Sequence, residues 1–186
     1  MKLAYSRATT IAALLFCSLW PAAPLAGERE SITARHFAVT RHAAQDAIFH
    51  EAKAVANSPD GTPWLPDAPQ CVTPVPSSTC DVPLDALRAA APLFWEPLHT
   101  SAGTPRWQVH IQAGLCYVYG EADAPVMAAI RRELRHSAGL AFCPAKAANG
   151  AACLPPLRGE DGTPLPLPDG LSTSSGHVVS VFRIHP

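Results

Sequence analysis

The chain has no run of lysine and arginine residues, and this absence bears first on its possible partners. Its 186 residues carry 14 Lys and Arg against 15 Asp and Glu, which gives a formal net charge of −1. A protein that binds DNA or RNA needs a basic surface to neutralise phosphates. The composition therefore predicts that nucleic acid is not a partner. No internal repeat is visible either.

Motifs of nucleophilic and redox catalysis are missing as well. There is no C-x-x-C pair, which disfavours a thioredoxin-like redox site and a zinc ribbon. Segment 172–177 lacks the G-x-S-x-G pattern of a nucleophile elbow and is predicted to be a turn. Glu160 and Asp161 lie in another predicted turn, where paired acids are normally solvated. Cys116 has no thiol-protease signature around it. We therefore expect no catalytic residues and no enzymatic activity.

The eight histidines do not form a metal-binding pattern. His36, His42 and His50 share a predicted helix, but no two of them are four residues apart, the spacing at which two imidazoles share a metal. His42 and His50 are separated by about 12 Å along the helix axis. We expect these three to face solvent, with no metal and no cofactor bound. Three further histidines lie in or beside predicted strands and could converge: His110, His177 and His185.

The N-terminal segment has the features of an export signal. Lys2 and Arg7 precede the uncharged stretch Ala8–Gly27, which contains the apolar run Ile11–Trp20. The basic end should stay in the cytoplasm, so the chain after Gly27 is predicted to be translocated. Residues 1–26 fit either a signal peptide or a membrane anchor. Pro24 breaks the A-x-A cleavage pattern, and twenty uncharged residues suffice to span a bilayer, whereas internal prolines disfavour a regular helix.

Five cysteines follow this segment and predict disulfides in an oxidising compartment. Sequence alone leaves the connectivity open. Cys71 and Cys80 flank one short loop and Cys143 and Cys153 another, so we predict these two bridges. Cys116 would then be the unpaired thiol, within an apolar strand.

The hydrophobic pattern predicts an α+β domain. Residues Ser31–Asn57 read as an amphipathic helix capped by Ser31, with an apolar face that Arg41 interrupts. A proline-rich loop at 58–81 precedes a short helix over Asp81–Ala91, capped by Asp81. The apolar face of the first helix comprises Phe37, Ala44, Ile48, Ala52 and Val55.

The second half alternates strands with one helix. Arg106–Tyr119 has strand periodicity, with a bend or bulge expected at Ala113-Gly114. Asp123 should cap a helix over Ala124–Ser137. Further strands are predicted at 140–143, 153–157 and 177–184. The expected fold is one domain over residues 27–186, with a long N-terminal amphipathic helix packed on a small antiparallel sheet in a pilin-like arrangement.

Arg131, Arg132 and Arg135 form the one cationic cluster of the sequence. They lie opposite the predicted apolar stripe of the second long helix. A solvated helix face explains them. A contact surface for a partner or for lipid headgroups is the alternative.

The order of several short motifs resembles the PilM family of conjugative thin pili, the type IVb pilus systems, and the similarity covers residues 32–186. The motifs are Trp107, Ile111–Tyr119, Ser137–Gly139, Asn149–Pro155, Leu165–Pro168, Gly170 and Gly176–Val179, preceded by the helix Arg35–Asn57, Val82–Leu87 and Phe94-Trp95. The resemblance implies a non-enzymatic component of pilus biogenesis, in the basal body or in pilin export. The Cys71–Cys80 insert and the Cys143/Cys153 pair depart from the family pattern.

The resemblance also sets the expected location and partners. It implies a periplasmic protein that docks on other pilus or secretion proteins, and on the inner membrane if residues 1–26 are retained. The alternative is a secreted, disulfide-stapled binding module or a minor-pilin-like subunit. A periplasmic hydrolase is the third hypothesis. It would require two or more of His110, His177, Asp161 and Cys116 to meet in one pocket.

Overall fold

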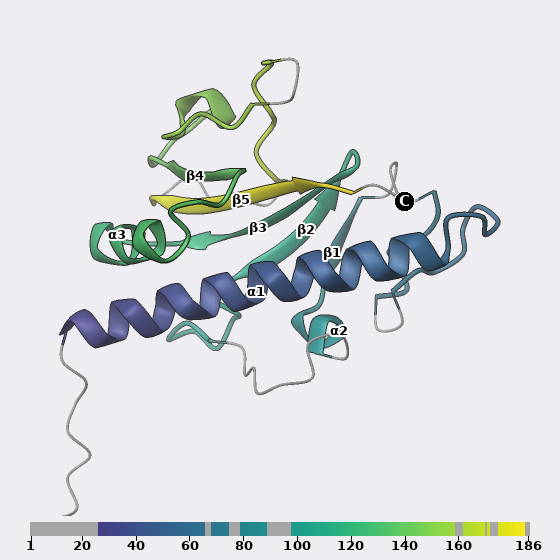
Figure 1. Cartoon of the computed structure of the whole chain (residues 1–186), viewed down its shortest axis with the longest axis horizontal. Coiled ribbons are helices and arrows are strands. Elements are labelled where there is room, and N and C mark those ends of the chain that lie inside the picture. The colour runs from purple at the N-terminus through teal and green to yellow at the C-terminus, as the bar shows by residue number, and fades with distance from the viewer. Residues whose placement is uncertain are drawn as a thin grey trace, which may run out of the picture.

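A 29-residue helix, α1 (Ala26–Ala54), runs along one face of a five-stranded antiparallel sheet (Figure 1). The computed structural model describes residues 26–65, 68–74, 79–88, 98–158, 162–169, 171 and 175–184. The strands are β1 (Cys80–Val82), β2 (Gln108–Gln112), β3 (Leu115–Glu121), β4 (Leu140–Cys143) and β5 (His177–Arg183), in the order β1-β2-β3-β5-β4. The predicted α+β class is confirmed.

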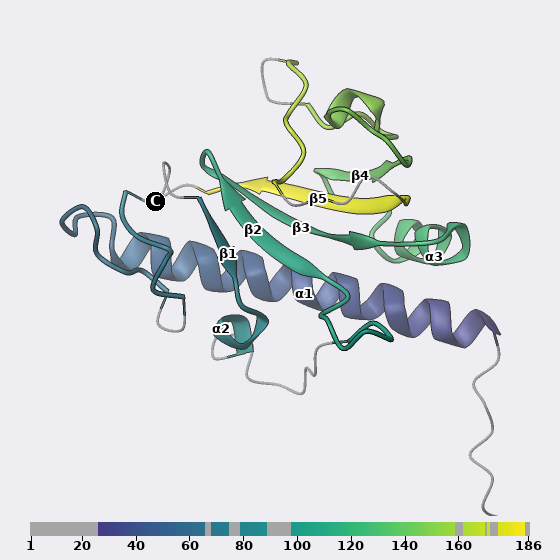
Figure 2. The same cartoon turned by 180° about the vertical axis from the view of Figure 1, so that it is seen from behind.

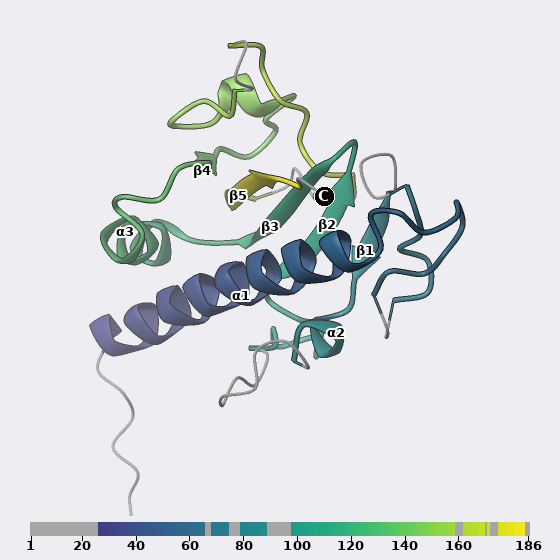
Figure 3. The ribbon, with the colours of Figure 1, turned by 45° about the vertical axis from the view of Figure 1, so that its right-hand side comes forward.

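Two further helices pack beside α1. Helix α3 (Ala124–Glu133) lies against the N-terminal half of α1, as Figure 3 shows, and α2 (Leu84–Arg88) follows β1. The predicted cap of α3 is confirmed, because the Val126 N–H donates to the Asp123 carboxylate at 3.0 Å. Val126, Ile130 and Leu134 are buried, as the apolar stripe predicts.

The predicted strand Arg106–Tyr119 is a hairpin, so the expected bend or bulge was wrong. Ala113 and Gly114 have φ of 51° and 74°, and they turn the chain between β2 and β3. Consecutive positive φ values are typical of the tight turns that match strand twist. After this two-residue turn, the face on which odd-numbered residues lie is reversed. Val109 and Ile111 therefore pack toward α1, whereas Tyr117 and Tyr119 belong to the apolar cluster on the other face.

Each face of the sheet has its own apolar cluster. The cluster facing α1 includes Phe37, whose ring meets Trp107 edge-on at 4.9 Å between centroids. The second cluster lies under the segment after β4, which rises over the opposite face (Figure 1). It combines strand residues with Leu157 and, more loosely, Leu165, Leu167 and Leu171.

Helix α1 begins at Ala26, so the predicted Ser31 cap was wrong. Ser31 is an interior helical residue, and Glu28 lies in the first turn, where an acidic side chain complements the helix dipole. The predicted apolar face is confirmed for Phe37, Ala44, Ile48 and Ala52, all of which are buried. Val55 lies just past the helix and is partly buried.

Arg41, which the sequence places within the apolar face, is itself buried. It is 8 % exposed, and its Nε donates to the Ser180 hydroxyl of β5 at 2.8 Å. Its Nη2 donates to the Ala138 carbonyl, between α3 and β4, at 3.4 Å. Burial lowers the pKa of Arg41 from its ordinary value. One side chain thus connects α1, β5 and the connection after α3.

Two other predictions differ from the structure. Asp81 is the middle residue of β1, and the helix that it was expected to cap begins only at Leu84. Segment 153–157, which was predicted to be a strand, is irregular apart from an isolated bridge between Leu154 and Phe142. The short 3-10 helix η2 (Gly150–Ala152) precedes it. Prolines at 155 and 156 remove the donors that a strand needs.

Both predicted disulfides are formed, one at each edge of the sheet. Cys71–Cys80 anchors edge strand β1, and Cys143–Cys153 anchors edge strand β4. Cys116 is a free buried thiol, as predicted.

Within the described residues, no helix is both long and apolar enough to cross a membrane. The predicted leader, residues 1–26, lies outside them except for Ala26.

Candidate functional site

Two adjoining pockets form a groove on the face of the sheet opposite α1, at the end where β2 begins and β3 ends. One has a volume of about 420 Å³ and the other about 520 Å³. They share four lining residues: Thr104, Pro105, Gln108 and Tyr119. We call the smaller one the Asp81 pocket and the larger one the Glu121 pocket, after an acidic residue in each.

A tight turn between His99 and Pro105 forms the outer wall shared by both pockets. Thr100 N–H donates to the Thr104 carbonyl at 2.8 Å, and the two threonine hydroxyls are also 2.8 Å apart. Gly103 takes a φ of +79° inside this turn, a conformation that glycine adopts without steric cost. The wall therefore has its own hydrogen-bonded structure.

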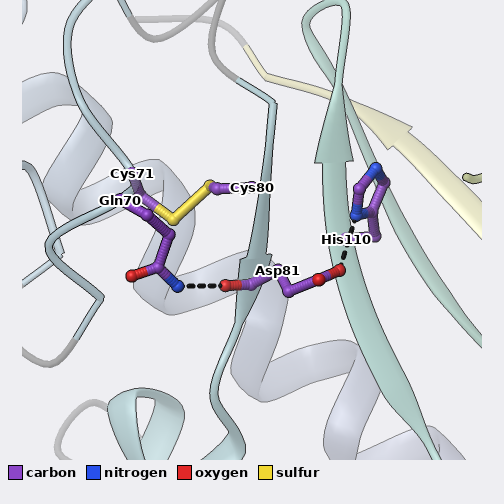
Figure 4. Close-up of a disulfide and its surroundings, with 5 residues drawn as sticks. All are labelled: Gln70, Cys71, Cys80, Asp81 and His110. Carbon is purple, nitrogen blue, oxygen red and sulfur yellow. Dashed lines mark hydrogen bonds and ion pairs between the residues drawn. A yellow bond between two sulfur atoms is a disulfide. The ribbon is translucent and has the colours of Figure 1, made fainter. Parts of the chain in front are cut away.

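The Asp81 carboxylate is held in place by a buried histidine (Figure 4). His110 Nδ1 lies 2.7 Å from Asp81 Oδ1, and the two residues are opposite each other in β2 and β1. The His110 side chain is 6 % exposed, whereas the Asp81 side chain is 84 % exposed. Because an ionised carboxylate can only accept, Nδ1 is the donor. His110 Nε2 is buried and has no hydrogen-bond partner among the described residues.

The same strand is fixed from its other side. Gln70 Nε2 donates to the Asp81 backbone carbonyl at 2.7 Å, and the neighbouring Cys71–Cys80 disulfide joins the two segments (Figure 4). Asp169, from the segment that covers this face, also lines the Asp81 pocket. Its backbone N–H donates to Gln112 Oε1 at 3.3 Å. Three separate stretches of chain therefore position two carboxylates in one pocket.

Two tyrosines on this face of the sheet, one of which lines both pockets, report the negative potential of the nearby carboxylates. Burial, together with Asp81 and Asp169, raises the pKa of Tyr119 to about 12. Burial, with Asp169 and Cys116, raises the pKa of Tyr117 to about 12. The Tyr117 hydroxyl donates to the Pro166 carbonyl at 3.3 Å. Each ring thus keeps its proton where a second negative charge would be unfavourable.

This arrangement predicts loss of stability in alkali. The pKa of both tyrosines is about 12 in the folded chain against the ordinary 10.0, so between these pH values the unfolded chain releases protons that the folded chain retains. The stabilisation is complete below pH 10 and is lost as pH rises toward 12, by roughly 1 to 3 kcal/mol for each tyrosine. Denaturant unfolding across this window should show the decline, and Tyr119→Phe should remove part of it.

A charge substitution provides the control for that experiment. Asp81 raises the pKa of Tyr119 but is not among the causes for Tyr117. Asp81→Asn should therefore move one of the two late tyrosinate absorbance transitions to lower pH and leave the other in place. Equal movement of both transitions, or of neither, would contradict this geometry.

Three of the four residues on which the hydrolase hypothesis depends lie in the described part of the chain, and these three do not meet. His110 and His177 lie on the same face, but β3 lies between their strands and they are four residue positions out of register, a separation of about 16 Å. Cys116 lies on the face toward α1, and burial raises the pKa of its thiol well above the ordinary value, which keeps it protonated and unreactive. Asp161 and His185 lie outside the described residues, as do Glu160 and Ser172–Ser174.

The helical histidines are largely placed as predicted. His42 and His50 are exposed, and His50 pairs with its neighbour Glu51 at 3.3 Å. His36 is partly buried instead of solvent-facing, its Nδ1 has no hydrogen-bond partner within the described segments, and desolvation lowers its pKa. The described part of the chain contains no group of three His, Cys, Asp or Glu residues that could hold a metal ion.

Sequence reasoning missed Asp81, Tyr119 and Asp169 as parts of one site. Asp81 before a proline was interpreted as a helix cap, which is a local signal. The three residues come from segments separated along the chain, and only strand pairing brings them together. His177 was singled out and does line the Glu121 pocket, with its Nδ1 donating to the Ser175 carbonyl at 2.8 Å.

Arg131 and Arg132 at the end of α3, and Arg135 in the turn after it, are exposed, and one of the three is packed. Arg131 places its guanidinium 4.5 Å from the centre of the Phe142 ring, while Arg132 and Arg135 face solvent.

Comparison of the chain with models of known families, with curated proteins and with solved structures gives no match.

Proposed function

We propose that the chain is a non-enzymatic, extracytoplasmic accessory component of type IVb pilus biogenesis, in the basal body or in pilin export. It acts by docking on other proteins of the pilus or secretion machinery. The observation that carries this proposal is the pair of disulfides, Cys71–Cys80 and Cys143–Cys153, because such bonds persist outside the cytoplasm. The export features of residues 1–26 and the resemblance to the PilM family support it.

The disulfides also bear on how the protein docks. An open sheet edge pairs readily with a strand from another chain. At β4, however, the Phe142 N–H and carbonyl already pair with Leu154. At β1, Gln70 occupies the Asp81 carbonyl, and the strand is only three residues long. Both edges are therefore poor templates for strand addition, which favours docking through side chains, in the groove or on the exposed face of α1.

A thiol count in exported material tests the location. After unfolding without reduction, we expect the four bridged cysteines to resist alkylation, leaving Cys116 as the reactive thiol of the described chain. Cys17 reacts in addition if residues 1–26 are retained, so peptide mapping of the same sample reports whether the leader persists. Alkylation of Cys71, Cys80, Cys143 and Cys153 without prior reduction would contradict an extracytoplasmic location.

Deletion of the gene in its bacterial host tests the role in the pilus. We expect thin pili to be lost while pilin itself is still made, and the wild-type gene to restore them. A deletion strain with normal thin pili would contradict the proposal. Normal pilin export in that strain would instead limit the role to the basal body.

A minor-pilin-like subunit is the second candidate, and one observation favours it. The long N-terminal helix α1 lies along one face of an antiparallel sheet (Figure 2), and in the sequence it follows the predicted leader. A subunit built into the fibre should sediment with sheared pili. An accessory component should stay with the cell envelope, and co-sedimentation in stoichiometric amount would favour the pilin-like alternative.

A further inference from the structure

We propose that the Asp81 pocket receives an arginine side chain from an extended segment of a partner polypeptide. This inference rests on the proposed function, since it names the chemistry by which a docking protein would recognise its partner. Two carboxylates, Asp81 and Asp169, line the pocket, and among the described residues that line it there is no lysine, arginine or histidine. The pocket therefore complements a cation.

The walls of the pocket fit the stem of a long side chain. Pro83, Leu84 and Pro105 give it apolar surface, whereas Gln70 and Gln108 supply amides near the carboxylates. Arginine combines an aliphatic stem with a planar head of five donors that can bind two acceptors at once. A lysine offers a more strongly hydrated point charge, so arginine is the better match.

The placement of Asp81 indicates a built site. His110 is 5 % exposed, and the only hydrogen bond that its ring makes in the described structure goes to Asp81. Leaving Nε2 without a partner costs free energy, while a bond to a carboxylate that is mostly in water returns little. The bond fixes Asp81 Oδ1, and the rest of this mostly exposed carboxylate lines the pocket, where a ligand can reach it.

The Glu121 pocket adjoins the Asp81 pocket, so the groove offers room for an extended segment on either side of the arginine. It continues past Gln108 and Tyr119 to Glu121 and His177, and it also contains Arg106, so its charges are mixed. The Arg106 guanidinium lies 5.5 Å from the centre of the Trp107 ring. A segment that places arginine in the Asp81 pocket can therefore run along the groove over Gln108, with mixed polar contacts beyond it.

Peptide titration of the oxidised domain tests this. The probe is a tri-arginine peptide, compared with a tri-citrulline peptide of the same shape without charge, and binding is followed through backbone amide NMR signals. We expect saturable shifts at Asp81, Gln108 and Tyr119 with tri-arginine only. Asp81→Asn and Asp169→Asn should each weaken binding about tenfold. The matched control Asp46→Asn, on the exposed side of α1, should leave it unchanged.

The role of His110 has its own readout. If His110 acts by positioning Asp81, His110→Phe weakens tri-arginine binding, and the double variant with Asp81→Asn binds no more weakly than Asp81→Asn alone. Additive losses would show that His110 does not act through Asp81.

Three results would overturn the proposal. Tri-citrulline could bind as tightly as tri-arginine, which would remove the charge argument. Shifts could spread over exposed carboxylates and persist in Asp81→Asn. Free arginine amide could bind as tightly as the peptide, which would indicate a small-molecule site. Each result leaves the thiol count and the pili of the deletion strain unaffected, so failure here is distinguishable from failure of the proposed function.

Discussion

Substitution of Gly139 by alanine should lower the free energy of unfolding by about 3 kcal/mol, through strain and overlap at the start of β4. Gly139 has a φ of +71°, and a Cβ atom added there would lie 2.1 Å from the Val181 carbonyl oxygen. That oxygen belongs to the backbone of β5, so it cannot rotate away. The Val181 N–H also donates to the Gly139 carbonyl at 2.8 Å, and separation of the strands would break this bond.

Gly61 offers a matched control for this variant. Its φ of +81° is similar, but nothing lies within 4 Å of a Cβ atom added there. Gly61→Ala should therefore carry only the backbone cost, about 1 kcal/mol. Denaturant unfolding of the two variants gives two losses in the free energy of unfolding, which can be compared when the dependence on denaturant concentration is the same in both. The difference between the losses is the contribution of the close approach between β4 and β5. Equal losses in the two variants would contradict it.

Replacement of Arg41 by alanine should cost a similar amount, about 3 kcal/mol. The change removes the hydrogen bond that Arg41 donates to the fully buried Ser180 hydroxyl at 2.8 Å. It also removes the longer hydrogen bond to the Ala138 carbonyl. It also leaves a cavity between α1, α3 and the sheet. Thermal or denaturant unfolding measures the loss. Hydrogen exchange should show it first in the amides at the contact between α1 and β5.

Two variants separate the causes of that loss. Arg35 lies on the exposed side of the same helix, so Arg35→Ala should change stability little. Arg41→Met keeps most of the volume and removes a buried charge that has no acidic partner in the described structure. It should recover much of the loss, because desolvation of the charge is then avoided. If Arg41→Met were as unstable as Arg41→Ala, the hydrogen bonds would outweigh packing.

Local chemistry was readable from the sequence. Asp123 and Pro125 specify the start of α3 through contacts within one helical turn, and the structure confirms that start. The apolar face of α1 follows from its helical spacing. The two short closures between cysteines were also predicted, and both bridges form. In each case the deciding partners are neighbours along the chain, so a local pattern contains the information.

Competing local signals caused the errors. Asp81 followed by Val82-Pro83 satisfies the pattern of a helix start, but pairing with β2 places Asp81 in a strand. Alternation continues in the sequence through Ala113 and Gly114, although the positive φ values there turn the chain back on itself. Strand periodicity shows only which positions alternate between the two faces of a sheet. It does not show that a turn reverses which of these positions face α1.

The sequence by itself determined the α+β class and the order of most elements. It left the cysteine connectivity open, although the two short closures that it favoured are the ones that form, and export of the chain stays a prediction. Tertiary structure alone decided the groove and the buried Arg41. Arg41 meets Ser180 across 139 positions, and Asp81, Tyr119 and Asp169 converge through strand register and a covering segment. The physical reason is that periodicity and capping depend on nearby residues, whereas burial, a shared pocket and a shared electric field depend on which distant segments pack together.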